Sequence, residues 1–273
     1  MSNSERIARF GQPTTKRPCI CLLFVLSVVL VISAGCESRT EKRPRQATVA
    51  NAPQPVAPVR PSEEEVLRAA AAQPSSALEG EGWQPLFDGK TLSGWRETEF
   101  AGRGELQCTH GLIVLQMGDP FTGINWTNDF PKMDYEIALD AMRVSGSDFF
   151  CGLTVPVSNS FCSLIVGGWG GSLVGISSLD GMDASENETT KFMNFEQGRW
   201  YRIRLRITEG RIEGWLDKEK LIDVVTTERR ISLRPGDIEY SKPLGVASYQ
   251  TTTALRQIRM RPISTPASPP KRF

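Results

Sequence analysis

The chain has 273 residues, with 32 Lys and Arg against 31 Asp and Glu, a formal net charge of +1 at pH 7, and 40% hydrophobic residues. Over residues 81–263 there are 20 basic and 24 acidic residues, and this mildly acidic balance argues against nucleic acid as a partner. The only histidine is His110, which excludes zinc sites that need two histidine ligands.

The N-terminus has the pattern of an export signal. Four basic residues precede the uncharged apolar run 19–34, which ends in Ser33-Ala34-Gly35-Cys36. Small residues before Cys36 resemble a bacterial lipobox, although Ser33 stands where Leu is usual. The resemblance implies that a signal peptide, 1–35, is removed and that Cys36 carries a lipid. We therefore expect a lipoprotein anchored to a membrane outside the cytoplasm; the alternatives are an uncleaved signal-anchor helix and plain secretion.

Residues 36–80 are expected to form a tether. Segment 37–80 contains six prolines and no aromatic residue, a composition that cannot build a core. Within it, Ser62 and Glu65 have capping-box spacing, which predicts one short helix that Pro74 ends. This helix is either a docking helix or a marginal helix within the linker. Its shortness favours the marginal alternative.

The most specific motif opens the next region. Residues Trp83–Trp95 have the sequence W-Q-P-L-F-D-G-K-T-L-S-G-W. This closely resembles the opening of a family of extracytoplasmic bacterial domains named for 3-keto-disaccharide hydrolysis, and it implies a concanavalin A-like jelly roll. His110-Gly111-Leu112 and Trp200–Leu205 also resemble family patterns. Asp148–Gly152 departs from the family's N-S-G-I-type segment, so the resemblance assigns no catalytic residue.

Residues 81–263 also predict an all-β domain on their own. Apolar residues alternate with charged ones over 135–140 and 200–207, which is the period of half-buried strands. Further strands are expected at 112–116, 121–126, 148–155, 160–166, 171–178, 211–217, 220–225, 244–250 and 254–262. Without crossover helices, so many short strands predict a two-sheet antiparallel sandwich. Residues 264–273 are expected to be a disordered tail.

If the signal is removed and Cys36 carries the lipid, three further cysteines remain, Cys108, Cys151 and Cys162. Cys151 and Cys162 flank a predicted hairpin turn, so a disulfide between them is one interpretation. The alternative, which we favour, is that they are buried free thiols acting as small hydrophobes. His110 lies in a predicted turn, and we expect it to be structural.

A glycine-rich segment presents a candidate sugar-binding aromatic. Trp169 stands within Gly167-Gly168-Trp169-Gly170-Gly171, where a flexible backbone can expose an indole face for stacking on a pyranose. The alternative is a tight bend with Trp169 as a lid on the core.

An acidic cluster follows it. Asp180, Asp183, Glu186 and Glu188 fall within nine residues. Asp180, Asp183 and Glu186 are candidate catalytic carboxylates. Asp180, Asp183 and Glu188 are candidate ligands for Ca²⁺, the only cofactor that the sequence suggests, although their spacing is not that of an EF-hand. The alternative is a solvated acidic loop, which relieves the repulsion by exposure.

A row of arginines follows one strand. Arg202, Arg204 and Arg206 share a face, and Trp215 lies on the next predicted strand. Arg202 and Trp215 are candidates for sugar binding. The alternative, which we favour, is a set of cross-strand salt bridges to Glu213 and Asp217.

The resemblance implies an enzyme that cleaves glycosidic bonds of 3-keto-sugars. The keto group acidifies the C2 hydrogen, so a base such as Asp180, Asp183 or Glu186 can start an elimination, with Arg202 or a cation as the electrophile. The chain lacks the E-x-D-x-x-E run of laminarinase-type jelly rolls. The alternative function is a non-catalytic module that binds glycan or protein. The expected partners are carbohydrate and, through the lipid, a membrane.

Overall fold

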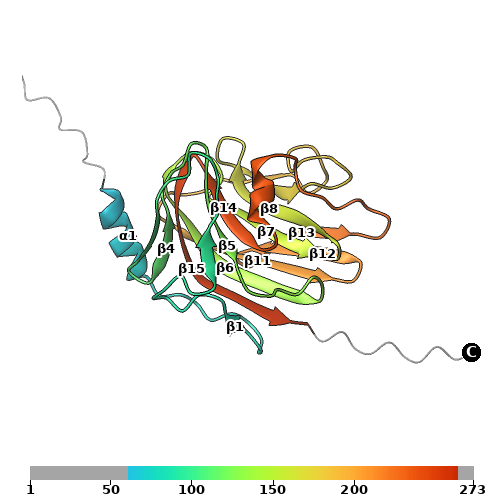
Figure 1. Cartoon of the computed structure of the whole chain (residues 1–273), viewed down its shortest axis with the longest axis horizontal. Coiled ribbons are helices and arrows are strands. Elements are labelled where there is room, and N and C mark those ends of the chain that lie inside the picture. Colours follow the sequence, from blue (N-terminus) through green and yellow to red (C-terminus); the bar gives the residue numbers. More distant parts are fainter. Residues whose placement is uncertain (1–60, 264–273) are drawn as a thin grey trace, which may run out of the picture. The chain divides into compact units, whose positions relative to one another are not determined.

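Two antiparallel sheets form the domain. The computed structural model describes residues 61–263 and is drawn in Figure 1. Sheet A has the strand order β13 (Glu219–Val225), β12 (Arg211–Leu216), β11 (Trp200–Thr208), β6 (Tyr135–Gly146), β15 (Thr251–Pro262), β4 (Leu112–Leu115) and β3 (Leu106–Thr109), with β1 (Gln84–Pro85) beside β15. Sheet B has the order β10 (Lys191–Phe192), β9 (Leu173–Ser177), β8 (Ser160–Gly168), β7 (Cys151–Val157), β14 (Gly245–Tyr249), β5 (Phe121–Trp126) and β2 (Trp95–Glu97). The predicted two-sheet sandwich is confirmed.

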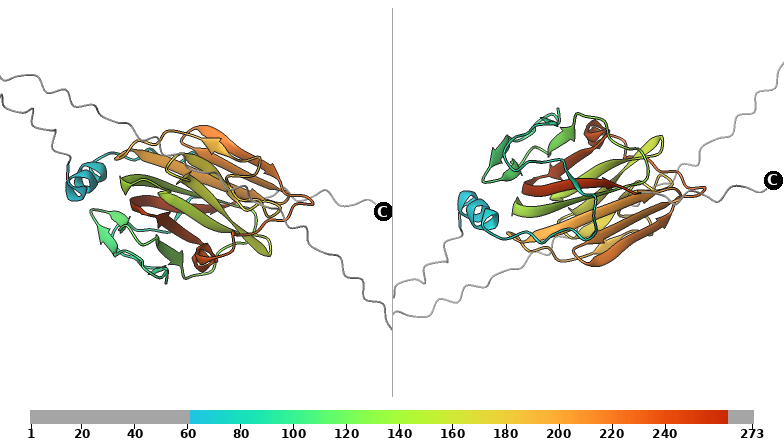
Figure 2. Two further views of the ribbon diagram at one scale, coloured as in Figure 1. Left: turned by 90° about the horizontal axis from the view of Figure 1, so that it is seen from above. Right: turned by 90° about the horizontal axis from the view of Figure 1, so that it is seen from below.

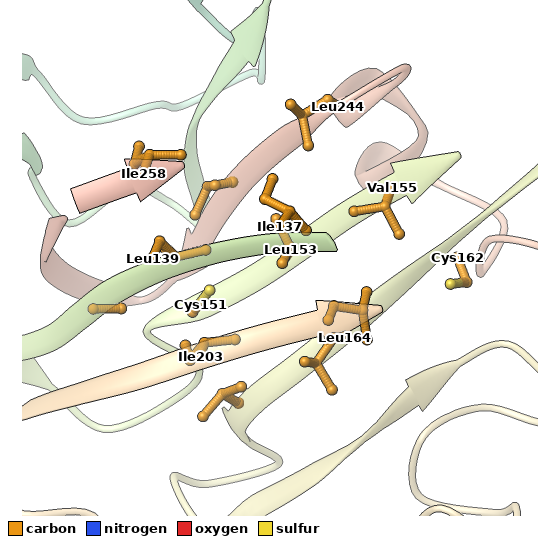
Figure 3. Packing of buried hydrophobic residues seen from close by; sticks show 14 of the residues in the cluster. Ile137, Leu139, Cys151, Leu153, Val155, Cys162, Leu164, Ile203, Leu244 and Ile258 are labelled. Carbon is orange, nitrogen blue, oxygen red and sulfur yellow. The ribbon is translucent and has the colours of Figure 1, made fainter. Parts of the chain in front are cut away.

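The core lies between the two sheets. On β11, Tyr201, Ile203 and their alternate neighbours are buried, while the arginines between them face outward. Ile203 pairs with Leu139 of β6 in sheet A, and the facing side chains of sheet B, such as Leu153 and Leu164, complete the same cluster (Figure 3). The alternation seen in the sequence therefore records this burial, because successive strand residues point to opposite faces.

The predicted strands are present, with changes at their ends. Strand 121–126 has the predicted bounds, whereas β15 starts three residues earlier than predicted, at Thr251. The predicted start at residue 148 is wrong, because Asp148 uses its carboxylate to accept from Phe149 N–H, and β7 begins only at Cys151. The short strands β1 and β2 lie at the two ends of the motif Trp83–Trp95, whereas β3, β10 and the 3₁₀ helix η1 (Asp237–Ser241) have no sequence prediction, since two to five residues carry no detectable period.

The two cysteines near the β7–β8 hairpin are free. Cys151 pairs with Val166, and Cys162 pairs with Val155, so the two thiols lie four register positions apart. Figure 3 shows them at separate places in the core. Burial raises the pKa of the Cys162 thiol to about 12. The disulfide interpretation is wrong, and the buried thiols act as small hydrophobes.

The predicted helix docks on sheet A. Helix α1 (Glu63–Ala71) has the full capping box between Ser62 and Glu65. Its Leu67 and Ala70 are buried against side chains of β4, β6 and β15. The marginal-helix interpretation is therefore wrong, because burial of one apolar face stabilises a helix too short to persist alone.

His110 adds a polar contact to this docking. It sits in the β3–β4 turn with a φ of 53°, and its Nε2 lies 3.1 Å from Glu64 Oε1 of α1. This contact is the largest cause that lowers the pKa of Glu64. The structural role expected for His110 agrees with its position.

The chain after α1 crosses the outer face of sheet A. We call residues 72–81 the strap. Its backbone carbonyls accept hydrogen bonds from arginines of the sheet: Gln73 from Arg256 at 2.6 Å and Ala77 from Arg202 at 3.2 Å. The sandwich therefore makes contacts with the chain upstream of residue 81, the expected domain start.

The remaining predictions concern the membrane anchor and the two ends of the chain. No helix in residues 61–263 is long and apolar enough to cross a membrane. The signal peptide, Cys36, most of the tether and the tail 264–273 lie outside the described residues. The two sheets and α1 are seen from two further sides in Figure 2.

Candidate functional site

The candidate residues from the sequence divide between two faces. Arg202 and Trp215 project from β11 and β12 on the outer face of sheet A. Trp169 and Asp183 lie in loops that follow β8 and β9 of sheet B and line one cavity there. Because the two faces belong to different sheets, these residues do not form one site.

The outer face of sheet A is held by two buried carboxylates of β6. Arg202 Nε donates to Asp140 Oδ1 at 2.7 Å, and Arg256 Nε lies 3.3 Å from Asp140 Oδ2. Glu136, whose side chain is fully buried, pairs with a second group of arginines. These are Arg204, Arg206 and Arg261. The arginine row is therefore neutralised from within its own sheet.

The predicted partners of that row are only partly right. Arg206 does lie 3.6 Å from Glu213. Asp217, however, accepts from the Arg202 backbone N–H and from Arg199 instead of pairing with the Arg202 side chain. The main partners are the acids of β6, which the alternation at 135–140 had already placed on the outward face.

Trp215 has cations on its ring. The guanidinium carbon of Arg204 lies 3.7 Å from the ring centroid, and Lys220 Nζ lies 5.4 Å away. These cation–π contacts occupy the surface on which a pyranose would have to stack. Together with the engaged guanidinium of Arg202, they give no support to sugar binding on this face, which stays a prediction.

The cavity lies on the outer face of sheet B and has a volume of about 400 Å³. Ile165 and Ser177 alternate with Leu164 and Ile176, which face the core, so the former two point outward. The lining residues are Pro120, Phe121, Asp148, Phe149, Ile165, Trp169, Ser177, Asp183, Arg234, Pro235, Asp237, Ile238 and Tyr249. This size and mixture of apolar and polar groups are typical of a small-molecule site.

Three aromatic rings form one wall of the cavity. Phe121 and Tyr249 meet edge to face with centroids 5.0 Å apart, and Phe149 lies 6.0 Å from Phe121 and 5.7 Å from Tyr249. Phe100 stacks on Phe121 from outside the cavity, with centroids 5.0 Å apart. Because each ring is packed by another, the wall is preformed.

The glycine-rich loop is built around a buried arginine. Arg143 Nη2 donates to the carbonyls of Asp148 at 3.0 Å and Gly171 at 3.0 Å, and its guanidinium stacks on Phe150. Burial lowers the pKa of Arg143. At Gly171, where φ is 104°, a side-chain carbon would come within 2.7 Å of the Ser147 carbonyl. The glycines therefore let the backbone wrap closely around this guanidinium.

This loop holds Trp169 at the rim of the cavity. Asp148 Oδ2 accepts from Gly170 N–H at 2.9 Å, which fixes the residue after the indole. Trp169 has a φ of 48° and is 42% exposed. The indole of Trp169 is therefore exposed on a backbone that is held in place, which agrees with the predicted sugar-binding aromatic. Its exposure argues against the alternative that Trp169 covers the core as a lid.

Of the predicted catalytic acids, only Asp183 lines the cavity. Its Oδ2 lies 2.8 Å from Arg234 Nη1 in an ion pair, and its Oδ1 accepts from Ala184 N–H at 2.7 Å. The guanidinium of Arg234 also lies 6.0 Å from the ring centroid of Trp169. Asp183, Arg234 and Trp169 thus form a row along the rim.

The other acids of the loop face elsewhere. Asp180 and Glu188 both pair with Arg229, and Asp180 also accepts from Arg230 N–H at 2.7 Å. The bond from Arg230 N–H is the main cause that lowers the pKa of Asp180, and the bond from Arg229 is the main cause for Glu188. Glu186 Oε2 accepts from the Asp183 backbone at 3.3 Å.

The predicted calcium ligands therefore form ion pairs with two different arginines. Asp180 and Glu188 are joined by Arg229, whereas Asp183 belongs to Arg234. Across residues 61–263, no three side chains of His, Cys, Asp and Glu are grouped as metal ligands. The geometry gives no support to a Ca²⁺ site here, and calcium stays a prediction from composition alone.

Several lining residues were missed by the sequence analysis. Arg234 and Asp237 lie in a loop and in η1, where no period or motif marks them. Phe121, Phe149 and Tyr249 appeared only as strand residues. The outward direction of Phe121 and Tyr249 follows from alternation, whereas Phe149 precedes β7, and the meeting of the three rings depends on how β5, β7 and β14 pair.

Comparison with known proteins gives a family match. Residues 82–261 match the family described as 3-keto-alpha-glucoside-1,2-lyase-like domain. No curated protein matches the chain in sequence.

Similar solved structures are related only distantly. A putative glycosyl hydrolase from Parabacteroides distasonis is 14% identical, covering 67% of this chain and 95% of its own, with a TM-score of 0.45. A carbohydrate-binding module, CBM66, from Bacillus subtilis is 10% identical, covering 62% and 95%, with a TM-score of 0.39. A putative beta-glucanase from Mycobacterium abscessus is 10% identical, covering 65% and 98%, with a TM-score of 0.39.

Proposed function

The chain belongs to the family of 3-keto-alpha-glucoside-1,2-lyase-like domains, and from this premise we propose that it binds a 3-keto-glycoside in the cavity on sheet B and cleaves the glycosidic bond. The observation that carries the proposal is the row at the rim. There a carboxylate, Asp183, and a guanidinium, Arg234, stand beside an exposed indole, Trp169. The carboxylate and the guanidinium can supply the base and the electrophile that a keto-sugar elimination needs, and the indole can hold the sugar.

The proposed chemistry begins at C2 of the sugar. The C3 carbonyl acidifies the C2 hydrogen, and Asp183 takes that proton. The electron pair of the C2–H bond forms a C2–C3 double bond, the π pair of the C3 carbonyl moves to O3, and the resulting enolate oxygen is stabilised by Arg234. This step needs one base and one electrophile rather than the two carboxylates of an oxocarbenium mechanism.

Bond cleavage follows when the enolate collapses. The C3 carbonyl reforms, a C1–C2 double bond forms and the C1–O bond breaks. The departing oxygen takes up one proton, so the products are an alcohol and a 2-hydroxy-3-keto-glycal. Later addition of water across the double bond gives the 3-keto-sugar, and the sum is then hydrolysis.

Trp169 is proposed to hold the sugar ring. Its indole is exposed at the rim and its backbone is fixed through the bond from Gly170 N–H to Asp148. A pyranose stacked there places its polar edge toward Asp183 and Arg234. Binding of the ring in this orientation would bring the reacting atoms close to the base and the electrophile.

A second function is favoured by one observation. Both carboxylate oxygens of Asp183 are already engaged, one by a hydrogen bond from Ala184 N–H and one by the ion pair with Arg234. If Arg234 does not turn from Asp183 to the substrate, the carboxylate has little capacity to act as a base. The cavity would then be the site of a non-catalytic carbohydrate-binding module.

One experiment separates the two functions. The purified full chain is incubated with 3-keto-trehalose and with a panel of alkyl and aryl 3-keto-glucosides, and the released alcohol and the glycal product are measured by mass spectrometry. The enzyme hypothesis expects turnover that Asp183→Asn lowers by about 10²- to 10⁴-fold. Asp180→Asn, on a carboxylate paired with Arg229, is the matched control and should stay near wild type. Saturable binding of the sugar without product indicates the binding module, and absence of both binding and product contradicts the proposal.

We also propose export and a lipid anchor, for which the support is the sequence around Cys36. The apolar run and the small residues before Cys36 resemble a lipoprotein signal. Radiolabelled palmitate should be incorporated into the wild-type chain in a bacterial host and not into Cys36→Ser. Equal incorporation, or none in either, would rule out this anchor.

A further inference from the structure

We propose that the cavity selects glycosides with an apolar leaving group, holding the sugar at the rim and the leaving group at the buried end. This inference rests on the proposed function, because it concerns the substrate of the same site. It comes from how polarity is distributed along the cavity rather than from the family.

The buried end of the cavity is apolar. Phe149 is 8% exposed, Ile165 is 4% exposed and Ile238 is 7% exposed. Ser177 on β9 is the one hydroxyl side chain among the lining residues at this buried level, and it is 4% exposed. The walls above are the rings of Phe121 and Tyr249. An apolar group placed here is removed from water on several sides.

The rim of the same cavity is polar. Arg234 and Asp237 are exposed, Trp169 is 42% exposed, and Asp183 joins Arg234 through the 2.8 Å ion pair. Hydroxyl groups of a sugar find both donors and acceptors at this level. Of the two charged groups that the proposed chemistry uses, Arg234 lies at the mouth, and Asp183 is paired with it and has a side chain that is 14% exposed.

This gradient fixes the direction of the substrate. A pyranose carries hydroxyls around its whole edge, and a buried hydroxyl without a partner loses its bonds to water. The buried end offers too few polar partners for a second sugar. A leaving group made of carbon and hydrogen has no such loss there. The cavity volume of about 400 Å³ is sufficient for one sugar and a ring-sized group.

The apolar end is also preformed. Phe149 packs against Gly152, where a side-chain carbon would come within 3.0 Å of its ring, and Phe121 is backed by Phe100. Ile238 is held in η1, a short helix that packs on β14 and β5. Since these side chains need not rearrange, the selectivity is set before the substrate arrives.

The test compares two 3-keto-glucosides that differ only in the end of the leaving group, 2-phenylethyl and 2-methoxyethyl. Their alcohols have similar acidity, so the chemical step does not separate them. The full chain should show a KM at least tenfold lower for the phenylethyl compound. Equal KM values for the two compounds would overturn the inference, while turnover of both leaves the proposed function intact.

Variants locate the selectivity. Ile238→Asn should bring the KM ratio of the two glucosides close to one, and Ile165→Thr should lower it as well. Trp169→Ala, at the rim, should weaken both substrates by the same factor and preserve the ratio. Circular dichroism and the melting temperature of each variant identify any that fail to fold. A ratio unchanged in both folded cavity variants also contradicts the inference.

A binding measurement separates this inference from the proposed function. Calorimetry with each glucoside needs no turnover. If neither compound yields product but the phenylethyl glucoside binds at least tenfold more tightly, the enzyme hypothesis fails and the selectivity stands. If both are turned over but bind equally, the enzyme hypothesis stands and the selectivity fails.

Discussion

The outer faces of the two sheets carry the same kinds of side chain and use them in opposite ways. On sheet A, arginines and Trp215 are saturated by Glu136, Asp140 and one another, and the strap closes part of the face. On sheet B, Trp169 and Arg234 stand at the mouth of a cavity. An Arg and Trp pattern thus indicates a binding surface where it borders a cavity, as Arg234 and Trp169 do, and not where the guanidinium lies directly on the ring, as Arg204 does on Trp215.

The largest effect should come from a substitution on the outer face of sheet A. Glu136→Gln removes the charge of a fully buried carboxylate that pairs with three arginines. The arginines then lose their counter-charge, and we expect the free energy of unfolding to fall by about 3 kcal/mol. Urea denaturation measures the loss. Glu213→Gln, at the more exposed end of the same network, is the control and should cost under about 1 kcal/mol.

Docking of the helix should have the next largest effect. Leu67 is 3% exposed in the contact of α1 with sheet A. Leu67→Ala should lower the free energy of unfolding by about 2 kcal/mol, since it removes buried methyl groups and leaves a cavity. Arg68→Ala, on the exposed side of α1, should change it by less than about 0.5 kcal/mol. If the two variants melt alike, the helix does not contribute to the fold.

On the outer face of sheet B, a substitution should lower carbohydrate affinity and leave stability almost unchanged. Trp169→Ala removes an exposed indole, so we expect carbohydrate affinity to fall about tenfold, or about 1.4 kcal/mol, while stability changes by less than about 0.5 kcal/mol. Calorimetric titration with the 3-keto-glucosides and a thermal melt give the two numbers. A large loss of stability with unchanged affinity would mean that the indole is structural, and the contrast between the faces would be lost.

The smallest effect concerns acid. The bonds from Arg211 and Lys220 lower the pKa of Asp223 on β13 to about 2. A depressed carboxyl pKa gives stability that is present above the unfolded pKa of 3.8 and is lost as the pH falls from about 4 to about 2. Asp223→Asn should flatten the stability profile slightly in this window. Because the group is exposed, 0.5 M salt should weaken the difference between the two proteins.

The sequence alone determined the sandwich and its family. Alternation at 135–140 and 200–207 gave strands, and the motif Trp83–Trp95 gave the resemblance that the family match over residues 82–261 bears out. The capping box also located α1, down to its N-cap at Ser62. These features are local, since a strand period, a turn and a cap are each set by residues within a few positions of one another.

Only the tertiary structure decided which candidate residues act together. Asp180 and Asp183 are three positions apart, yet one turns to Arg229 and the other to Arg234 beside Trp169. The strap on sheet A and the aromatic wall on sheet B likewise join segments far apart in the chain. Such contacts depend on strand order and register, which alternation does not encode, because every antiparallel pairing of the same strands has the same period.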